Sequence, residues 1–418
     1  MKKIYSSVRG TSDFNGSSVL EFNRANKTAA KIFKLFGYEE IILPILEEKD
    51  LFVKSVGETT DIVERQIFKI EGKDVVLRPE GTAQVIRYYL ANSLHKKSDF
   101  HKLFYIGAMF RGERPQKGRL RQFHHIGAEA IGSNSAYLDA EMIILSLKIL
   151  DAIGIKDKTL KINSLGCKED KDTLAKMLRK DLLERKRDLC EDCQRRLDKN
   201  PLRVLDCKKP QCQKAARGYF NIDMEVGENL CPGCFDHYRD VLNILKRLGV
   251  VAQPDPCMVR GLDYYTNTVF EITAPGLGSK DAIGAGGRYN NLVESLGGPS
   301  KAAIGFALGL ERILLSLGES KKKQKLDYFI AVDSKSLIEE GFYFLNNLRE
   351  KGISADFDYC GKSLKAQLRI AQKKGAKYVV ILAGDKYKTG YLALRNMQDS
   401  TQEDIRLENF LARFKPKE

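Results

Sequence analysis

Apolar and polar side chains along the first part of the chain predict alternating helices and strands. Apolar residues at helical spacing across residues 17–37 predict a helix that Gly37 ends. The next segment, YEEIILPILEEKDLF, begins as a strand, and Pro44 interrupts it, as suits an edge strand or an interface. Residues 67–77 predict a hairpin, and another helix is expected to start near Thr82.

A basic hairpin is expected from Phe104 to Gly132. Its two ends are apolar and β-prone, whereas its middle contains glycine, proline and five arginine or lysine side chains. The pattern predicts two strands joined by a long loop, which suits a polyanion better than a core. A helix across 136–152 and a strand across 159–164 are expected next.

The middle of the chain changes character at residues 168–250, which are highly charged, mostly helical in pattern and contain six of the nine cysteines. We expect an inserted domain here, because strand-like sequence resumes at Met258. Three expectations follow for the later segments. VRGLDYYTNTVFEI is expected to be a strand, AIGAGGRYNNLVESL a glycine turn entering a helix, and AAIGFALGLERILLSL a strand or tight turn leading into a helix.

The charged linker KKKQK at 321–325 marks the last boundary. Beyond it, strand and helix patterns alternate, which predicts an α/β domain with a largely parallel sheet. The expected fold class is therefore α/β. The expected domains are a core of residues 1–167 and 251–320, the inserted helical domain of 168–250, and an α/β domain of 326–418.

Composition narrows the possible partners. The formal net charge is +15 over 418 residues, which favours nucleic acid, nucleotides or another polyanion, although a merely basic surface would look the same. No apolar run is long enough to span a bilayer, and the first residues do not form a secretory signal. A cytoplasmic protein without membrane contact is expected.

Arginines are the candidate phosphate-binding groups, because two familiar nucleotide motifs fail. CGKS resembles the end of a phosphate-binding loop, but Asp356 replaces the first glycine, and GLGSKDAIGAGG lacks the dinucleotide-binding spacing. Arginine offers a planar, permanently charged fork to phosphate. The candidates, each beside glycine or an aromatic or apolar segment, are Arg111, Arg114, Arg260 and Arg312.

Six motifs in order carry a resemblance to a known family. RGTSDF, RPEGTAQVIR, FRGERPQKGRLRQF, RGLDYY, GGRYNNL and AIGFALGLER resemble a class II histidyl-tRNA synthetase of bacterial type, over essentially the whole chain from Arg9. RGLDYY followed by GGRY is specific to this family. The resemblance implies an antiparallel core sheet flanked by helices, a homodimer formed through the Pro44 segment, and a C-terminal anticodon-binding domain.

The resemblance also implies the reaction. L-histidine would attack ATP to give histidyl-adenylate and pyrophosphate, and tRNA(His) would then accept the histidyl group and release AMP, with Mg²⁺ accompanying ATP. Arg111 and Arg260 would be catalytic, on two sides of the α-phosphate, and Arg312 would hold the γ-phosphate. The residues implied to bind ATP are Arg111, Glu113, Arg114, Arg119 and Arg312. The loop residues implied to reach the acceptor end of the tRNA are Arg114, Lys117, Arg119 and Arg121.

A pocket for histidine is implied by further matches. Its residues are Glu80, Gly81, Thr82, His125, Glu129, Arg260, Tyr264, Tyr265, Arg288 and Tyr289. In the resemblance Glu80 and Thr82 contact the amino group, and Glu129 with the tyrosine pair contacts the imidazole, although the pair also fits an ordinary core strand. His125 departs from the family's usual glutamine, and a protonated imidazole there would repel the substrate's ammonium.

The cysteines form a second pattern. Two CxxC pairs, Cys190 with Cys193 and Cys231 with Cys234, predict a structural Zn²⁺ site, with reduced thiols as the open alternative. Two other functions also stay open. A non-catalytic regulatory subunit of ATP phosphoribosyltransferase shares the core but lacks the last domain, and a pure RNA-binding protein would need no amino-acid pocket.

Overall fold

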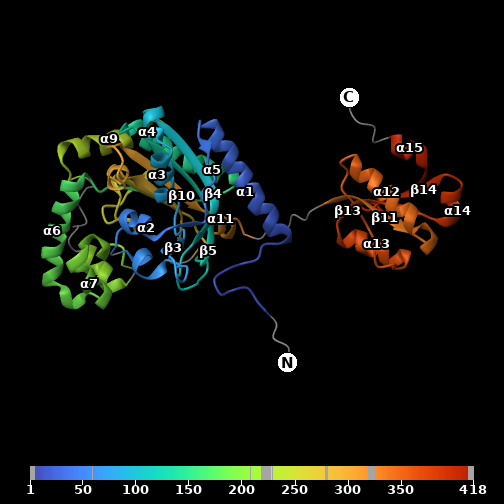
Figure 1. Cartoon of the computed structure of the whole chain (residues 1–418), viewed down its shortest axis with the longest axis horizontal. Coiled ribbons are helices and arrows are strands. Elements are labelled where there is room, and N and C mark those ends of the chain that lie inside the picture. The colour runs from blue at the N-terminus through green and yellow to red at the C-terminus, as the bar shows by residue number, and fades with distance from the viewer. Residues whose placement is uncertain are drawn as a thin grey trace. The chain divides into compact units, whose positions relative to one another are not determined.

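The structure is a computed structural model that describes residues 5–58, 60–207, 209–217, 227, 229–277, 281–318 and 325–412. It divides into two compact units, shown in Figure 1. Most of the chain up to residue 319 forms the larger unit, and residues 320–418 form most of the smaller one.

The larger unit is built on an eight-stranded sheet. Its order is β1-β4-β5-β10-β9-β8-β6-β7. The six inner strands pair antiparallel, and the two short outer strands add in parallel. In this order the strands are Glu39–Glu40, His101–Phe110, Gln122–Ile131, Ala303–Gly309, Ala282–Arg288, Thr266–Thr273, Thr159–Ser164 and Ala252–Pro254. This confirms the predicted fold class.

Helices cover one face of this sheet. Apolar residues of α1 (Gly16–Leu35), α5 (Ala136–Ile153) and α9 (Pro232–Arg247) pack in one buried cluster with the sheet. Phe33 of α1 stacks on Phe104 of β4 with ring centroids 4.5 Å apart. Because side chains alternate along a strand, Leu103 and Tyr105 point to the opposite face, where α3 (Thr82–Ala91) packs.

Short elements complete the larger unit. Those around α3 are β2 (Leu46–Glu48), α2 (Lys49–Val56), a π-helical turn (Ile62–Gln66), β3 (Val75–Leu77), α4 (Leu94–Lys97) and α10 (Leu292–Ser295). Helix α11 (Leu310–Leu317) follows β10 and packs against β5. The charged middle of the chain forms α6 (Lys168–Glu184), η2 (Lys186–Asp188), α7 (Glu191–Lys199), η3 (Pro201–Val204) and α8 (Pro210–Arg217), followed by α9. In Figure 1, α6 and α7 lie at the end of this unit remote from α1. The limits of an inserted domain stay a prediction.

The smaller unit has a five-stranded sheet with its own core. The strand order is β12-β11-β13-β14-β15, from Ala355–Phe357, Leu326–Val332, Ala376–Leu382, Tyr391–Asn396 and Gln402–Arg406. Its helices are η4 (Lys335–Leu337), α12 (Ile338–Glu350), α13 (Leu364–Lys373), α14 (Gly384–Lys388) and α15 (Leu407–Ala412). Only β12, β11 and β13 are parallel, and β14 and β15 pair antiparallel. The sheet is therefore mixed rather than largely parallel. Only the short helix α14 joins β13 to β14, and a tight turn joins β14 to β15, so neither connection is the long crossover that a parallel pair needs.

Two local predictions were wrong. Residues 259–265 form a loop, and strand β8 begins only at Thr266. The Asp263 and Tyr265 carbonyls of this loop accept hydrogen bonds from Lys171 Nζ instead of from a neighbouring strand. The glycines of AIGAGGR lie in strand β9 instead of a turn. A Cβ on Gly286 would lie 2.4 Å from the Gly305 carbonyl oxygen, so the close approach to β10 requires glycine.

Candidate active site

A cavity of about 600 Å³ opens on the second face of the larger sheet. Strands β4, β5, β8, β9 and β10, the 259–265 loop and the region of α7 and η3 supply its wall. The predicted residues that line it are Glu80, Thr82, Arg111, Glu113, Arg119, His125, Arg260, Tyr264, Tyr265 and Arg312. Segments up to about 230 residues apart in the chain therefore meet in one space.

Two of the arginines that line this cavity, Arg111 and Arg312, are held by hydrogen bonds to backbone carbonyls. Arg111 donates from Nε to the Pro79 carbonyl at 2.9 Å, and its guanidinium lies 5.2 Å from the Phe123 ring centroid. Arg312 donates from Nε to the Gly118 carbonyl at 2.8 Å and also binds the Ala282 carbonyl. Such contacts fix the direction of the planar fork.

Arg260 is held by an acidic partner that the sequence did not single out. Its Nη1 lies 2.6 Å from Oε2 of Glu271 on β8. Its buried Nε has no hydrogen-bond partner among the described residues, so one donor of this arginine is unsatisfied. Glu271 interrupts the apolar run VFEI. A charged residue inside a predicted strand was the sequence signal that could have identified it.

Glu129 is a fully buried carboxyl that does not line the cavity itself but contacts the lining residue Thr82. Thr82 Oγ1 donates to its Oε1 at 2.7 Å, and the Tyr289 hydroxyl donates to its Oε2 at 2.5 Å. Burial nevertheless raises the pKa of Glu129 to about 8, because desolvation outweighs these hydrogen bonds. A Cβ on Gly305 would lie 1.6 Å from Oε2, so glycine at that position makes room for the carboxyl.

Glu80 lies at the start of α3, where its carboxylate accepts two backbone hydrogen bonds. The donors are the N–H groups of Thr82 at 2.6 Å and Ala83 at 2.9 Å. Burial raises the pKa of Glu80, although both hydrogen bonds and Arg111 oppose the shift. Next to it, Gly81 is required by packing, since a Cβ there would lie 2.3 Å from the Tyr105 ring.

The tyrosine pair lies on the 259–265 loop. Tyr264 and Tyr265 have ring centroids 4.7 Å apart, and Tyr264 meets Tyr289 edge-on at 5.6 Å. The loop is held by its neighbour in sequence, Asp263, whose Oδ1 lies 2.9 Å from Nη2 of Arg203. Arg203, which sequence reasoning missed, lines the cavity and holds this loop in place.

His125 lies on β5 beside Phe123, with ring centroids 5.1 Å apart. Burial lowers its pKa to about 3, with smaller contributions from Arg111, Arg78 and His124. The imidazole is therefore neutral near pH 7 and does not repel an ammonium group. Its buried Nδ1 has no partner among the residues that the structure describes.

Three other predicted residues occupy different surroundings. Arg288 is fully buried and lies outside the cavity wall, where it forms an ion pair with Asp139 and donates to the carbonyls of Ser133 and Ser135, each at 2.9 Å. Its guanidinium is thus engaged in holding α5 to β9. Tyr289 also lies outside the cavity wall and donates to Glu129, and Arg114 is exposed and does not line the cavity.

The four thiols expected to form one zinc site do not lie together, so that prediction was wrong. Cys190 and Cys193 meet Cys207 and Cys212, whereas Cys231 and Cys234 meet Cys167 and Asp170. The two CxxC pairs are separated by 37 residues of the chain. In the folded protein each pair lies next to other possible ligands instead of next to the second pair.

Comparisons with known proteins decide the family. A family model described as histidyl-tRNA synthetase matches residues 10–200 and 224–313, and one described as anticodon binding domain matches residues 327–417. The chain belongs to the histidyl-tRNA synthetase family. The histidine–tRNA ligase of Halothermothrix orenii is 42% identical over 410 residues, which cover 96% of this chain and 97% of that protein.

Solved structures of this family share the fold. The apo histidyl-tRNA synthetase of S. aureus has a TM-score of 0.80 and 31% identity, covering 98% of this chain and all of that one. A Bacillus halodurans C protein titled ATP phosphoribosyltransferase regulatory subunit/histidyl-tRNA synthetase has a TM-score of 0.66 over 92% of this chain and all of that one, but 20% identity shows the fold alone. Full-length identity to ligases and the anticodon-binding match favour the synthetase over the regulatory subunit. No described helix is long and apolar enough to cross a membrane.

Proposed function

We propose that this histidine–tRNA ligase activates L-histidine with ATP as histidyl-adenylate, releases pyrophosphate, and transfers the histidyl group to tRNA(His) with release of AMP. One observation carries the proposal. Three arginines suited to a triphosphate and a buried carboxyl–tyrosine set suited to an amino acid line or adjoin the same cavity of about 600 Å³. A cavity of this size is in the usual range for a nucleotide or similar ligand.

The first step requires correct positioning of the reactants and neutralisation of phosphate charge, and it does not require a general base. A histidine carboxylate is already a nucleophile, so the site must align it with the α-phosphorus and neutralise the phosphate oxygens. Arg111 is proposed to hold the α-phosphate, Arg260 to approach it through its unsatisfied Nε, and Arg312 to hold the γ-phosphate. Mg²⁺ is expected to enter with ATP, and Glu113 and Glu311 of the cavity wall offer it oxygen ligands.

Recognition of histidine is proposed at the other end of the cavity. The carboxylate of Glu80 suits the substrate's ammonium, with Thr82 beside it. Glu129 and the Tyr264–Tyr265 pair suit the imidazole, because they offer hydrogen-bonding groups on an aromatic wall. Neutral His125 adds one unsatisfied ring nitrogen that a ligand can use.

Contact with tRNA is proposed at two places. Arg114, Lys117, Arg119 and Arg121 of the β4–β5 loop would approach the acceptor end, where phosphate contacts supply affinity. The smaller unit, which matches the anticodon-binding model, would bind the anticodon through unstacked bases.

A homodimer is also proposed, through the segment around Pro44. Its support is a group of apolar side chains left exposed in the single chain. Ile42 is 94% exposed, and Ile45 and Leu46 are 45% and 52% exposed, as expected for a surface that another copy covers. The protein is proposed to work in the cytoplasm, where its tRNA substrate is found.

The test is amino-acid-dependent exchange of pyrophosphate into ATP, measured with each of the twenty amino acids in the absence of tRNA. Histidine alone should support exchange. No exchange with histidine from folded protein would contradict the proposed reaction, and exchange with another amino acid would contradict the assigned pocket.

A further inference from the structure

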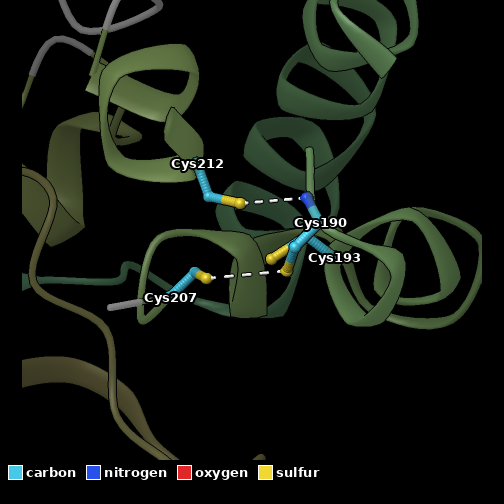
Figure 2. Close-up of side chains that lie close together, drawn as sticks. All are labelled: Cys190, Cys193, Cys207 and Cys212. Carbon is cyan, nitrogen blue, oxygen red and sulfur yellow. Dashed lines mark hydrogen bonds between the residues drawn. The ribbon is translucent and has the colours of Figure 1, made fainter. Parts of the chain in front are cut away.

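Four cysteine side chains meet inside the helical region of the larger unit (Figure 2). We propose that this four-cysteine cluster, Cys190, Cys193, Cys207 and Cys212, is a structural Zn²⁺ site with four thiolate ligands. Their sulfur atoms all lie within 4.8 Å of one another, and those of Cys190 and Cys207 are 4.0 Å apart. Four sulfurs at about 2.3 Å from a tetrahedral zinc lie roughly 3.8 Å from each other. The cluster is therefore close to the size that the ion requires.

The local backbone also suits metal-bound thiolates. Cys190 precedes α7, and Cys193 lies in the first turn of that helix, whereas Cys212 lies in the first turn of α8. Helix N-termini favour negative charge, which stabilises the thiolate form that binds metal. The Cys190 backbone N–H also donates to Cys212 Sγ at 3.2 Å, a contact drawn in Figure 2. The spacings CxxC and CxxxxC are both within the range of structural zinc ligands.

Burial of the cluster argues for a structural role. The four thiols are at most 8% exposed and pack among apolar side chains such as Leu178, Leu182 and Val204. Around them are helices of nine and eight residues and 3-10 turns of three and four. Elements this short are marginal by themselves, so a metal that ties them together would contribute directly to folding.

The second cluster of possible ligands is less suited to zinc. It consists of Cys167, Asp170, Cys231 and Cys234, and thus offers three sulfurs and one oxygen. The Asp170 oxygens already accept the backbone N–H groups of Cys167 at 3.2 Å and Cys231 at 3.0 Å. An ion there would compete with both helix-start contacts, and Cys231 is exposed.

The zinc site would also support the substrate pocket without touching substrate. Turn η3 lies between Cys193 and Cys207, and it carries Arg203. This arginine donates from Nη2 to the Gly261 carbonyl and to Asp263, both at 2.9 Å. Loss of the metal should therefore loosen the loop that carries the Tyr264–Tyr265 pair.

The deciding experiment uses the unmodified full-length protein, purified without a polyhistidine tag or chelator. Mass spectrometry of the metals should find about one zinc per chain, and X-ray absorption at the zinc edge should find four sulfurs at about 2.3 Å. Less than about 0.2 zinc per chain would overturn the proposal. One zinc with an oxygen in its first shell would also overturn it, because that shell fits the Asp170 cluster.

A pair of matched variants supplies an independent test. Cys193→Ser should lose one equivalent of zinc and melt at a lower temperature, whereas Cys231→Ser should keep that equivalent. The reverse result would overturn the proposal. If Cys193→Ser does not fold, the absorption spectrum of the unmodified protein still decides the question, and neither measurement depends on ligase activity.

Discussion

The hydroxyl of Tyr289 lies 2.5 Å from Oε2 of Glu129 and donates a hydrogen bond to a carboxyl that has no exposure to solvent. Even with this donor, burial raises the pKa of Glu129 to about 8, above the ordinary value of 4.5. Glu129 is therefore mostly protonated in the folded protein at pH 7 in the absence of substrate. Its charge state and the stability of the fold are linked.

Stability should depend on pH through Glu129. Between about pH 4.5 and pH 8 the folded state keeps this proton while the unfolded state has lost it, so the contribution to stability is full at low pH and falls as pH rises. Glu129→Gln removes this dependence. The free energy of unfolding of the variant, relative to that of the unmodified protein, should rise by on the order of 4 kcal/mol from pH 4.5 to pH 8.5. Thermal melts of both proteins at the two pH values check this. If the melting temperatures of the two proteins differ by the same amount at both pH values, Glu129 is not a buried, protonated carboxyl.

Gly305→Ala should weaken histidine binding and also lower the melting temperature, because the added Cβ would lie 2.8 Å from the Ala128 carbonyl oxygen of the neighbouring strand. The added Cβ would lie 1.6 Å from Oε2 of Glu129 and would force that carboxyl out of place. Measured below the melting temperature, the Michaelis constant for histidine in the exchange assay should rise about 10–100-fold, as expected when a buried hydrogen-bonding partner is lost and the substrate's ring nitrogen is left unsatisfied. Gly309→Ala is the control on the same strand, because its nearest atom outside the chain neighbours is Arg312 Cδ at an ordinary 3.5 Å.

His125→Gln should leave the Michaelis constant for histidine unchanged or lower it. The imidazole is neutral because burial lowers its pKa to about 3, and glutamine is also a neutral hydrogen-bonding side chain. Between pH 5.5 and pH 7.5 the two proteins should show parallel pH profiles for this constant. A large rise in the variant would show that the imidazole has a dedicated role in binding.

Arg260→Ala should reduce histidine-dependent exchange by about 10²–10³-fold, the usual cost of removing one positioned donor from a charged transition state. tRNA binding, measured by filter retention, should be nearly unchanged, since Arg260 lies in the cavity. Arg239→Ala is the matched control, because this arginine of α9 is 55% exposed and pairs with Asp236 on the surface. Equal effects of the two substitutions would exclude a catalytic role for Arg260.

Asp139→Asn tests the assignment of Arg288 as structural. Breaking a fully buried ion pair costs about 3–5 kcal/mol, so the variant should melt well below the unmodified protein. The Michaelis constant for histidine, measured below the melting temperature, should change little. Asp151→Asn on the same helix affects a 57% exposed carboxylate and should cost less than about 1 kcal/mol. A rise in the Michaelis constant without loss of stability would instead favour the substrate role first expected for Arg288.

Much of the fold and of the cavity wall followed from local patterns. Strand β6 has the predicted limits, and Arg111, Arg260 and Arg312 line one cavity, as the motifs implied. Motifs locate such residues because burying a polar side chain within an apolar segment costs free energy unless it forms a hydrogen bond or binds a ligand.

The remaining features depend on distant partners. Arg288 meets Asp139, 149 residues away, and nothing local distinguishes that ion pair from a ligand-binding arginine. The pairing of the cysteines depends on how short helices pack, which spacing alone leaves open. The glycines of β9 looked like a turn because their reason, close contact with the β10 backbone, lies in another strand.

The two margins of the large sheet limit how copies of this protein can meet. At one margin, β1 consists of Glu39 and Glu40, both exposed and both acidic. At the other, β7 ends in Pro254, which has no N–H to offer a further strand. Charge and proline at sheet margins discourage strand-by-strand fusion between molecules. Copies of the protein should therefore resist joining into continuous intermolecular sheets at these two margins.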